Sequence, residues 1–313
     1  VSMNELAISG HTADEITAEL EKLVAKQKAI QQQVHSTSER TFLQAVGEAY
    51  KNLFKPDTSL KAGWDNFNRN FGGLQRGGLY IIAARPGDGK TDFSLQLAVQ
   101  LAKKYRVDYR SLEMTKEQLV HRILSRVCTI NSTRFRDHDI DEAAQQRIGY
   151  VVDRMGDLHF VMDDTPNISV EDVEAKLESG KPDALFIDYL GLMKGDTSCK
   201  KPLWQITGEI THALKALAQK YNVVIVALVQ LARAVDKQKE PTLSDLKGGS
   251  DIEADADGVM FIRPQKTEDF LSGDDSWPVD VIFAKNRHGG TGRLKFDWQP
   301  QYHNYVQIER NRG

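Results

Sequence analysis

The sequence predicts an α/β fold in which a mostly parallel β-sheet carries a late β-hairpin and is preceded by a helical segment. From about Ser59 onward, short apolar segments alternate with segments of helical periodicity, which favours parallel strands joined by helices. A glycine-rich turn follows the first apolar segment and leads into a helix-like stretch. Near the end, two strand-like segments flank Lys285–Thr291, whose Gly289 and Gly290 favour a turn, so we expect a hairpin there.

The individual elements are expected from apolar runs of strand length and from apolar residues that recur every three or four positions. Strands of the sheet are expected at residues 79–84, 107–112, 159–162, 184–187, 223–229 and 258–262. Helices are expected at residues 92–104, 116–126, 170–177 and 205–220. The two strands of the hairpin are expected at residues 279–284 and 292–298.

The first part of the chain differs from this pattern and predicts a helical linker segment at residues 1–57, ahead of a domain at residues 58–313. Apolar side chains recur at helical spacing between Ile16 and Val34 and again between Leu43 and Leu53. Such short helices are marginal alone, so their apolar faces should pack against something. Two alternatives stay open: a hairpin packed on its own domain, or a helix that docks on a neighbouring subunit.

The composition is that of an ordinary globular chain of 313 residues, with 40% apolar and 27% charged residues. The net charge of −3 provides no overall basic field, so any binding of nucleic acid depends on local loops. With two cysteines, Cys128 and Cys199, the chain has no disulfide framework, and we expect a cytoplasmic location. The longest apolar run, residues 223–229, is far shorter than the ~20 residues that cross a bilayer, so no membrane span is expected.

The glycine-rich turn has the residues and the position of a phosphate-binding P-loop, because it connects an apolar strand to a helix. Gly87 and Gly89 let backbone N–H groups face phosphate oxygens, and the helix N-terminus adds partial positive charge. Lys90 supplies a cation for the β- and γ-phosphates of a nucleotide, and Thr91 supplies a hydroxyl for Mg²⁺. The expected nucleotide-binding residues are Arg85, Pro86, Gly87, Asp88, Gly89, Lys90 and Thr91.

A second half of the same site is expected about 100 residues later, where the apolar run Leu185–Ile187 ends in Asp188. A carboxylate at the end of a buried strand can hold Mg²⁺ through water, opposite the P-loop hydroxyl. The expected metal-binding residues are therefore Thr91 and Asp188.

Further motifs follow in an order that resembles the DnaB-type replicative DNA helicase family. The resemblance covers about residues 58–298 and rests on nine short motifs. These are Gly-Leu-Gln-Arg-Gly (73–77), Ala-Ala-Arg-Pro-x-x-Gly-Lys-Thr (83–91), Ser-Leu-Glu-Met (111–114), Ile-Asp-Tyr-Leu (187–190), Leu-Lys-Ala-Leu-Ala (214–218), Ala-Leu-x-Gln-Leu (227–231), Ser-Asp-Leu (244–246), Asp-Ala-Asp (255–257) and Ala-Lys-x-Arg (284–287). The family implies a RecA-like P-loop ATPase fold and a ring, usually a homohexamer, around single-stranded DNA.

The resemblance also implies roles for single residues. Glu113 matches the catalytic base that polarises the attacking water, and Gln230 matches the residue that senses the γ-phosphate. Lys285 and Arg287 match a finger pair that an adjacent subunit inserts into the site, where a cationic fork suits the charge on the transferred phosphoryl group.

The segment between Arg233 and Asp251 is the expected DNA-binding loop, because basic side chains and glycine N–H groups can hold a phosphate backbone. The expected DNA-binding residues are Arg233, Lys237, Lys247, Gly248 and Gly249. A second pore loop is expected at residues 191–204, with Lys194, Lys200 and Lys201.

The sequence departs from the family at three places. Asp88 stands where the family usually has methionine, and Gly248 stands where it usually has glutamate. The collar domain that binds primase in the family has no counterpart ahead of the linker, so we expect either a fragment or a shortened helicase.

The resulting hypothesis is an Mg·ATP-dependent helicase motor that moves along single-stranded DNA and unwinds duplex, with a helicase loader or a primase as further partners. The alternatives are a RecA-like recombinase or another ring ATPase, and a nucleotide-dependent DNA-binding scaffold with little catalysis.

Overall fold

The chain forms two compact units, Val1–Thr58 and Ser59–Gly313. The computed structural model describes residues 15, 17–19, 21–25, 42–195, 202–231, 240–246, 249–265 and 276–308. Within these ranges, no helix is both long enough and apolar enough to cross a membrane.

The first unit contains helix α3 (Phe42–Leu53) and helical residues between positions 15 and 25. An ion pair of 2.7 Å between Lys51 Nζ and Glu21 Oε1 joins these two stretches. Helix α3 agrees with the second helix expected in the linker, whereas most residues of the first expected helix lie outside the described ranges. Phe42 and Leu53 are largely exposed, so α3 leaves apolar side chains uncovered at both of its ends.

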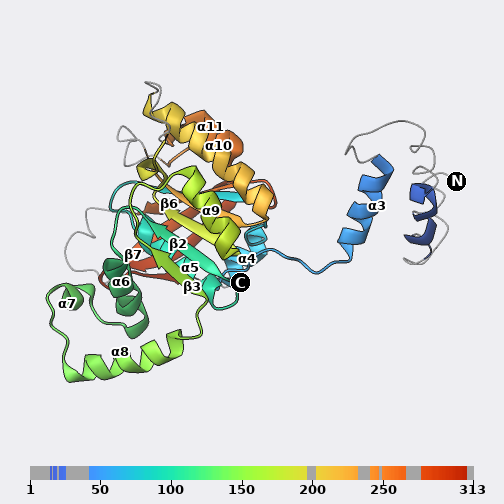
Figure 1. Cartoon of the computed structure of the whole chain (residues 1–313). Helices are drawn as coiled ribbons and strands as arrows, with labels where there is room; N and C mark the ends of the chain where they lie inside the picture. Colours follow the sequence, from blue (N-terminus) through green and yellow to red (C-terminus); the bar gives the residue numbers. More distant parts are fainter. Residues whose placement is uncertain are drawn as a thin grey trace. The chain divides into compact units, whose positions relative to one another are not determined.

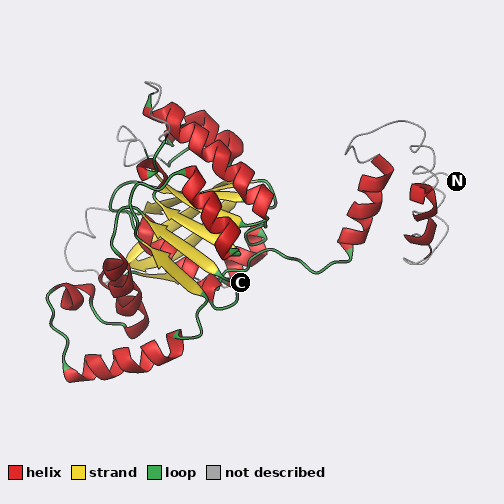
Figure 2. Ribbon diagram, in the orientation of Figure 1, coloured by secondary structure: helices red, strands yellow, loops and turns green. Residues whose placement is uncertain are grey.

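The second unit is built on a nine-stranded sheet of order β3-β2-β4-β5-β1-β6-β7-β8-β9. The strands are β1 (Leu79–Ala84), β2 (Val107–Ser111), β3 (Phe160–Asp163), β4 (Ala184–Asp188), β5 (Val224–Gln230), β6 (Gly258–Pro264), β7 (Trp277–Asn286), β8 (Gly292–Gln299) and β9 (Asn304–Gln307). Strands β1 to β6 pair in parallel, whereas β7, β8 and β9 continue the sheet as an antiparallel meander. Figure 2 shows this sheet in yellow between layers of helices.

Helices cover both faces of the sheet (Figure 1). The described helices of this unit are α4 (Asp65–Phe71), α5 (Lys90–Ala102), α6 (Lys116–Cys128), α7 (Ser132–Arg136), α8 (Glu142–Met155), α9 (Val170–Gly180), α10 (Leu203–Tyr221) and α11 (Gly249–Asp255), of which α7 and α8 pack with α6 in a separate apolar cluster. On one face, α4, α5 and α6 pack in a core that includes Tyr80 and Ile82 of β1. On the other, α9, α10 and α11 pack in a core that includes Leu79 and Ile81. Because both faces of β1 are covered, every residue of this strand is buried and apolar.

The fold class predicted from the sequence is confirmed, since the sheet is mostly parallel and ends in the hairpin β7–β8. Each strand and helix expected from residue 79 onward lies within a few residues of an observed one. The sequence analysis did not predict β9, nor the helices α4, α7, α8 and α11.

An aromatic cluster joins α4 and α5 to the antiparallel strands. The ring of Phe67 lies 5.3 Å from that of Phe283 on β7 and 6.4 Å from that of Trp64. Trp64 in turn stacks on Phe93 of α5 at 5.1 Å. The cluster thereby fixes the meander against the same helix whose first turn carries the P-loop lysine.

Replacing the fully buried Phe67 by alanine should lower the free energy of unfolding by about 3–5 kcal/mol, because it leaves a cavity in this cluster. Urea denaturation followed by tryptophan fluorescence measures the change. The matched control is Tyr150→Ala on α8, whose ring is 61% exposed and for which we expect a loss below about 1 kcal/mol. Equal losses in the two variants would contradict the burial of Phe67.

Candidate active site

The turn between β1 and α5 has the backbone of a phosphate-binding loop. Gly87 and Gly89 adopt φ values of 78° and 82°, in the left-handed region that glycine alone enters without strain. The N–H of Asp88 donates to the carbonyl of Arg85 at 3.2 Å, and this bond closes the turn. Helix α5 begins at Lys90, so its first N–H groups and its partial positive charge face the space in front of the turn.

The last strand of the sheet supports this turn from behind. The hydroxyl of Tyr305 on β9 donates to the carbonyl of Gly89 at 3.2 Å. Gln96 of α5 holds the same residue by two bonds to the Tyr305 backbone, of 2.8 and 2.9 Å. A Cβ atom at position 89 would lie 2.2 Å from the Tyr305 hydroxyl oxygen and 3.0 Å from the Trp298 ring, so only glycine fits there.

Two opposite charges are buried directly behind the turn. Asp188, at the end of β4, accepts a hydrogen bond of 2.8 Å from the Thr91 hydroxyl and one of 3.1 Å from the Tyr109 hydroxyl, both at Oδ2. Lys90 Nζ lies 3.6 Å from Asp188 Oδ1 and 4.5 Å from the centre of the Tyr189 ring. Burial lowers the pKa of Lys90, although the charge of Asp188 opposes this shift.

Among the residues that the structure describes, neither Lys90 Nζ nor Asp188 Oδ1 has a hydrogen-bond partner. A buried ammonium without an acceptor fits a phosphate in front of it. The Thr91 hydroxyl and the unpartnered Asp188 oxygen are hard oxygen donors, which fit Mg²⁺. The residues present therefore fit both groups that the sequence predicts.

A cavity of about 380 Å³ opens in front of these groups. Its lining includes six of the seven predicted nucleotide-binding residues: Arg85, Pro86, Gly87, Gly89, Lys90 and Thr91. Glu113, just beyond the end of β2, and Gln230, at the end of β5, line it as well. Asp88 does not line it: this residue is buried, and its carbonyl lies 3.4 Å from the Tyr305 hydroxyl.

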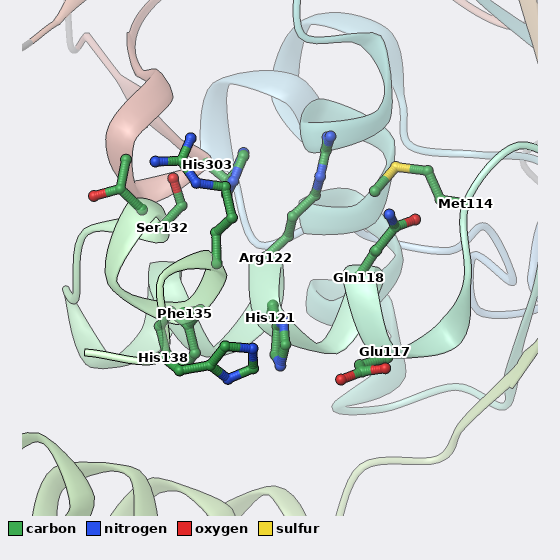
Figure 3. A pocket seen from close by; sticks show the side chains of 11 residues that line it. Met114, Glu117, Gln118, His121, Arg122, Ser132, Phe135, His138 and His303 are labelled. Carbon is green, nitrogen blue, oxygen red and sulfur yellow. The ribbon is translucent and has the colours of Figure 1, made fainter. Parts of the chain in front are cut away.

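A second cavity, of about 400 Å³, lies beside the first between α6, α7 and the segment after β8, and shares Met114, Arg122 and His303 with it (Figure 3). Arg122 and His303 both pair with the buried carboxylate of Asp92, at 2.6 and 3.0 Å. Burial alone would raise the pKa of Asp92, but the bond with His303 and the charge of Arg122 hold it below its usual range.

Sequence reasoning missed this trio. Asp92 directly follows the P-loop threonine, but His303 lies 211 residues further along the chain and belongs to no motif. No local sequence signal connects the two residues.

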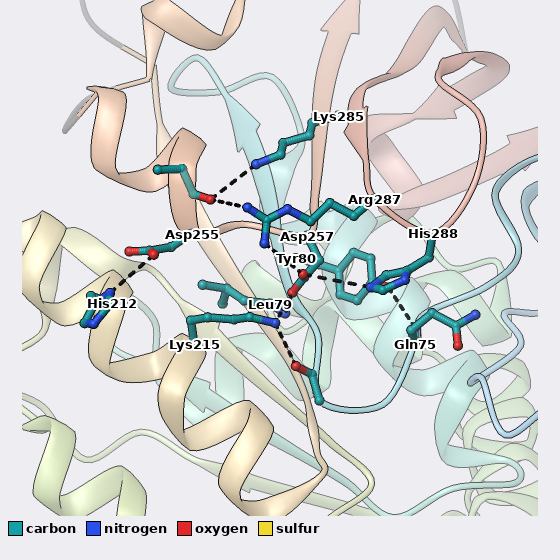
Figure 4. Close-up of polar contacts among 12 residues, drawn as sticks. Gln75, Leu79, Tyr80, His212, Lys215, Asp255, Asp257, Lys285, Arg287 and His288 are labelled. Carbon is teal, nitrogen blue, oxygen red and sulfur yellow. Dashed lines mark hydrogen bonds and ion pairs between the residues drawn. The ribbon is translucent and has the colours of Figure 1, made fainter. Parts of the chain in front are cut away.

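Lys285 and Arg287, predicted as finger residues, do not line the cavity formed by their own chain. Both bond instead to carbonyl groups at the C-terminal end of α11, and Figure 4 shows the two side chains meeting at one of these carbonyls. Lys285 donates to Glu253, and Arg287 donates to Ala254 at 2.6 Å. Partial burial and the adjacent charge of Arg287 lower the pKa of Lys285.

Most predicted DNA-binding residues lie outside the described ranges: Arg233, Lys237, Lys247 and Gly248. Gly249 is the first residue of α11. In the second predicted loop, the backbone N–H of Lys194 donates to the Ile168 carbonyl at 2.8 Å, whereas Lys200 and Lys201 lie outside the described ranges.

The chain is similar to known proteins over most of its length. The family described as DnaB-like helicase C terminal domain matches residues 59–307. A probable replicative DNA helicase of Trieres chinensis is 34% identical over 311 residues, which cover 95% of this chain and 68% of that protein. The replicative DNA helicase DnaB of Geobacillus stearothermophilus is 32% identical over 322 residues, covering 97% and 70%.

Two solved structures also resemble the chain over most of its length. One, described as an ATPase domain, superposes with a TM-score of 0.77 at 26% identity and covers 87% of this chain and 100% of that one. A DnaB-like replicative helicase, described with its interactions with primase, superposes with a TM-score of 0.75 over 98% of this chain and 77% of that one. Its identity is 24%, so this second likeness concerns the fold alone.

Replacing Gly89 by alanine should disrupt the turn, because the new Cβ meets Tyr305 and the backbone is left-handed. We expect the free energy of unfolding to fall by about 1–3 kcal/mol and the affinity for a fluorescent ATP analogue to be lost. Gly149→Ala on α8, where an added Cβ meets nothing within 4 Å, is the control and should stabilise the chain by about 0.5–1 kcal/mol. Normal nucleotide affinity of the Gly89 variant would contradict this account of the turn.

Proposed function

The chain belongs to the DnaB-like helicase family, whose C-terminal motor domain it contains, and from this membership we propose how its residues carry out ATP hydrolysis. As a DnaB-family motor domain, it is an ATP-dependent replicative DNA helicase and binds nucleotide. The observation that carries our proposal is the buried Lys90 ammonium, which has no hydrogen-bond acceptor among the described residues and faces the P-loop cavity.

We propose that the triphosphate of ATP lies along the turn from Gly87 to Thr91. The N–H groups at the start of α5 point at its oxygens, and Lys90 donates to the β- and γ-phosphates. The left-handed glycines permit this close approach of the backbone. Asp88 is buried and does not line the cavity, so its carboxylate would not contact the phosphates there.

Thr91 and Asp188 are the residues that would hold Mg²⁺, since their oxygens already meet at 2.8 Å. Bound there, the ion would neutralise charge on the phosphates. The hydrogen bond from Tyr109 orients the Asp188 carboxylate and leaves its second oxygen free of hydrogen bonds from described residues.

Glu113 and Gln230 are proposed to act on the reacting end of the nucleotide. The Glu113 carboxylate is exposed at the cavity, where it can orient a water molecule for attack and accept its proton. Gln230 lines the same cavity from the end of β5, the neighbour of β1, where its amide can contact the γ-phosphate. Gln230 comes from the strand next to β1, whereas Glu113 follows β2, which β4 and β5 separate from β1. Both side chains nevertheless line the same cavity, which supports their assignment to one reaction.

Lys285 and Arg287 are proposed to act on the ATP of an adjacent subunit. Their positions outside their own cavity support this assignment, because a finger that served its own nucleotide would line that cavity. We therefore propose a homohexameric ring with a nucleotide at each interface. Single-stranded DNA would pass through the ring, in contact with the loops that include Lys194, Arg233, Lys237, Lys247 and Gly248.

Further partners belong to the same proposal. A primase or a helicase loader would bind the ring. The exposed apolar residues of α3 would dock the linker on a neighbouring subunit. We also place the protein in the cytoplasm.

Lys90→Ala should abolish ATP-dependent separation of a forked DNA duplex and reduce steady-state hydrolysis to background, because the phosphates lose their cation. Strand separation is followed by release of a labelled strand, and hydrolysis by release of phosphate. The control is Lys116→Ala, a half-exposed lysine paired with Asp164 outside the cavity, which should keep both activities. Full hydrolysis by a folded Lys90→Ala protein would refute the proposed P-loop role.

Mixed rings test whether the finger acts between subunits. Lys90→Ala and Arg287→Ala should each be nearly inactive alone, whereas rings assembled from both should regain hydrolysis. The reason is that some interfaces then join an intact P-loop to an intact finger, a group worth on the order of 10³-fold in rate. A finger that acts within its own subunit would give no recovery at any mixing ratio. Titration of each variant against the wild type measures how far inactive neighbours silence intact interfaces.

A further inference from the structure

We propose that Asp257, held by Lys215, is the residue that positions the Arg287 finger. This inference rests on the proposed function of Arg287 and adds two residues to it. Asp257 precedes β6 and is 3% exposed, and it lies between the finger strand β7 and helix α10 (Figure 4).

One oxygen of the Asp257 carboxylate is held by hydrogen bonds from its own domain. Its Oδ2 accepts hydrogen bonds from the backbone N–H of Leu79, at 2.8 Å, and from Lys215 Nζ, at 2.6 Å. Lys215 Nζ donates in addition to the carbonyl of Gly77 at 3.0 Å. These bonds fix the carboxylate at the start of β1, so it has little freedom to rotate.

The other oxygen faces the finger. Asp257 Oδ1 lies 3.5 Å from Arg287 Nη1 and 3.9 Å from His288 Nε2. The main chain connects the same two residues, because the N–H of Arg287 donates to the Asp257 carbonyl at 2.7 Å. The backbone N–H and Nη1 of Arg287 thus both contact one buried aspartate, while its Nη2 donates to the Ala254 carbonyl at 2.6 Å.

The pair of Asp257 and Lys215 is the buried part of this arrangement. The Asp257 side chain is 4% exposed and that of Lys215 is 14% exposed, so their attraction is weakly screened by water. The Arg287 side chain is 47% exposed, which leaves part of its guanidinium available for a phosphate outside the subunit. Asp257 therefore sets the direction of Arg287 without covering it.

Asp257→Asn separates this role from the structural one. The amide oxygen can keep the bonds from Leu79 and Lys215, because both converge on one atom. The amide nitrogen then takes the place of Oδ1 and presents N–H groups to the N–H groups of Arg287. The fold keeps its hydrogen bonds, whereas the Arg287 guanidinium loses the Oδ1 acceptor and its opposite charge and keeps the bond to the Ala254 carbonyl.

We expect Asp257→Asn to lower kcat by about 10- to 100-fold, the loss typical of a misplaced reacting group, and to leave KM for ATP within about twofold of the wild type. The ATP-binding groups of the subunit are untouched by this substitution. The matched control is Asp255→Asn, two residues earlier, which removes a surface pairing with His212 at 3.3 Å and should keep the kcat of the wild type.

Mixed rings identify the side of the interface that is damaged. Asp257→Asn subunits mixed with Lys90→Ala subunits should regain hydrolysis, because the first supplies the P-loop and the second supplies the finger. Asp257→Asn mixed with Arg287→Ala should show no recovery, because both lack a working finger. The reverse pattern would overturn the proposal, and so would equal recovery in both mixtures.

A double variant tests whether Asp257 acts through Arg287. In the Arg287→Ala background, Asp257→Asn should cause no further loss of kcat, and an additive loss would overturn the proposal. Circular dichroism and light scattering verify folding and ring assembly in each sample. If Asp257→Asn fails to assemble, Asp257→Glu takes its place: it keeps the charge and moves it by one methylene, and it should show the same mixing pattern with a smaller loss.

These outcomes are distinct from a failure of the proposed function. Absence of hydrolysis in the wild type, or absence of recovery when Lys90→Ala is mixed with Arg287→Ala, would contradict the proposal of a shared site itself. A normal kcat of Asp257→Asn, together with recovery in that mixture, would contradict only the positioning role of Asp257.

Discussion

The pairing of Lys90 with Asp188 is the interaction on which the candidate site depends. Removing two charges from water costs several kcal/mol for each ion unless partners compensate. Asp188 receives hydrogen bonds from Thr91 and Tyr109, whereas Lys90 Nζ has the Asp188 carboxylate and the face of the Tyr189 ring beside it and donates no hydrogen bond to a described residue. An arrangement that leaves a buried ammonium short of an acceptor contributes little to the stability of the fold. It is better explained as a site prepared for an anion.

The strand order brings the remaining groups to the same place. Strands β2, β4, β5 and β1 are neighbours in the sheet, so their carboxyl ends form one edge. Glu113, Asp188, Gln230 and the P-loop follow these ends, which is where ligands bind in open parallel sheets. The cavity is therefore a consequence of topology as much as of the individual side chains. The proposed finger residues do not lie at this edge. Strand β7 is antiparallel to β6, so its end brings Arg287 to α11 instead.

Much of this could be predicted from the sequence, because the information is local. A P-loop is a contiguous motif between a strand and a helix, and Asp188 ends a visibly apolar run. The parts that escaped prediction depend on contacts between distant residues. His303 reaches Asp92 across 211 positions, and Asp257 reaches Leu79 across 178. The short strand β9 has an alternating burial that only its partner β8 and helix α5 explain.

The support of the P-loop by β9 has a consequence for how the protein is made. Tyr305 lies 216 residues after Gly89, so the turn leaves the ribosome long before the side chain that holds it in shape. Until β9 is synthesised and added to the edge of the sheet, helix α5 lacks the bonds between Gln96 and the Tyr305 backbone as well. A nascent chain would thus carry the complete P-loop sequence without its supported geometry. Nucleotide binding would begin only when this last strand of the sheet is in place.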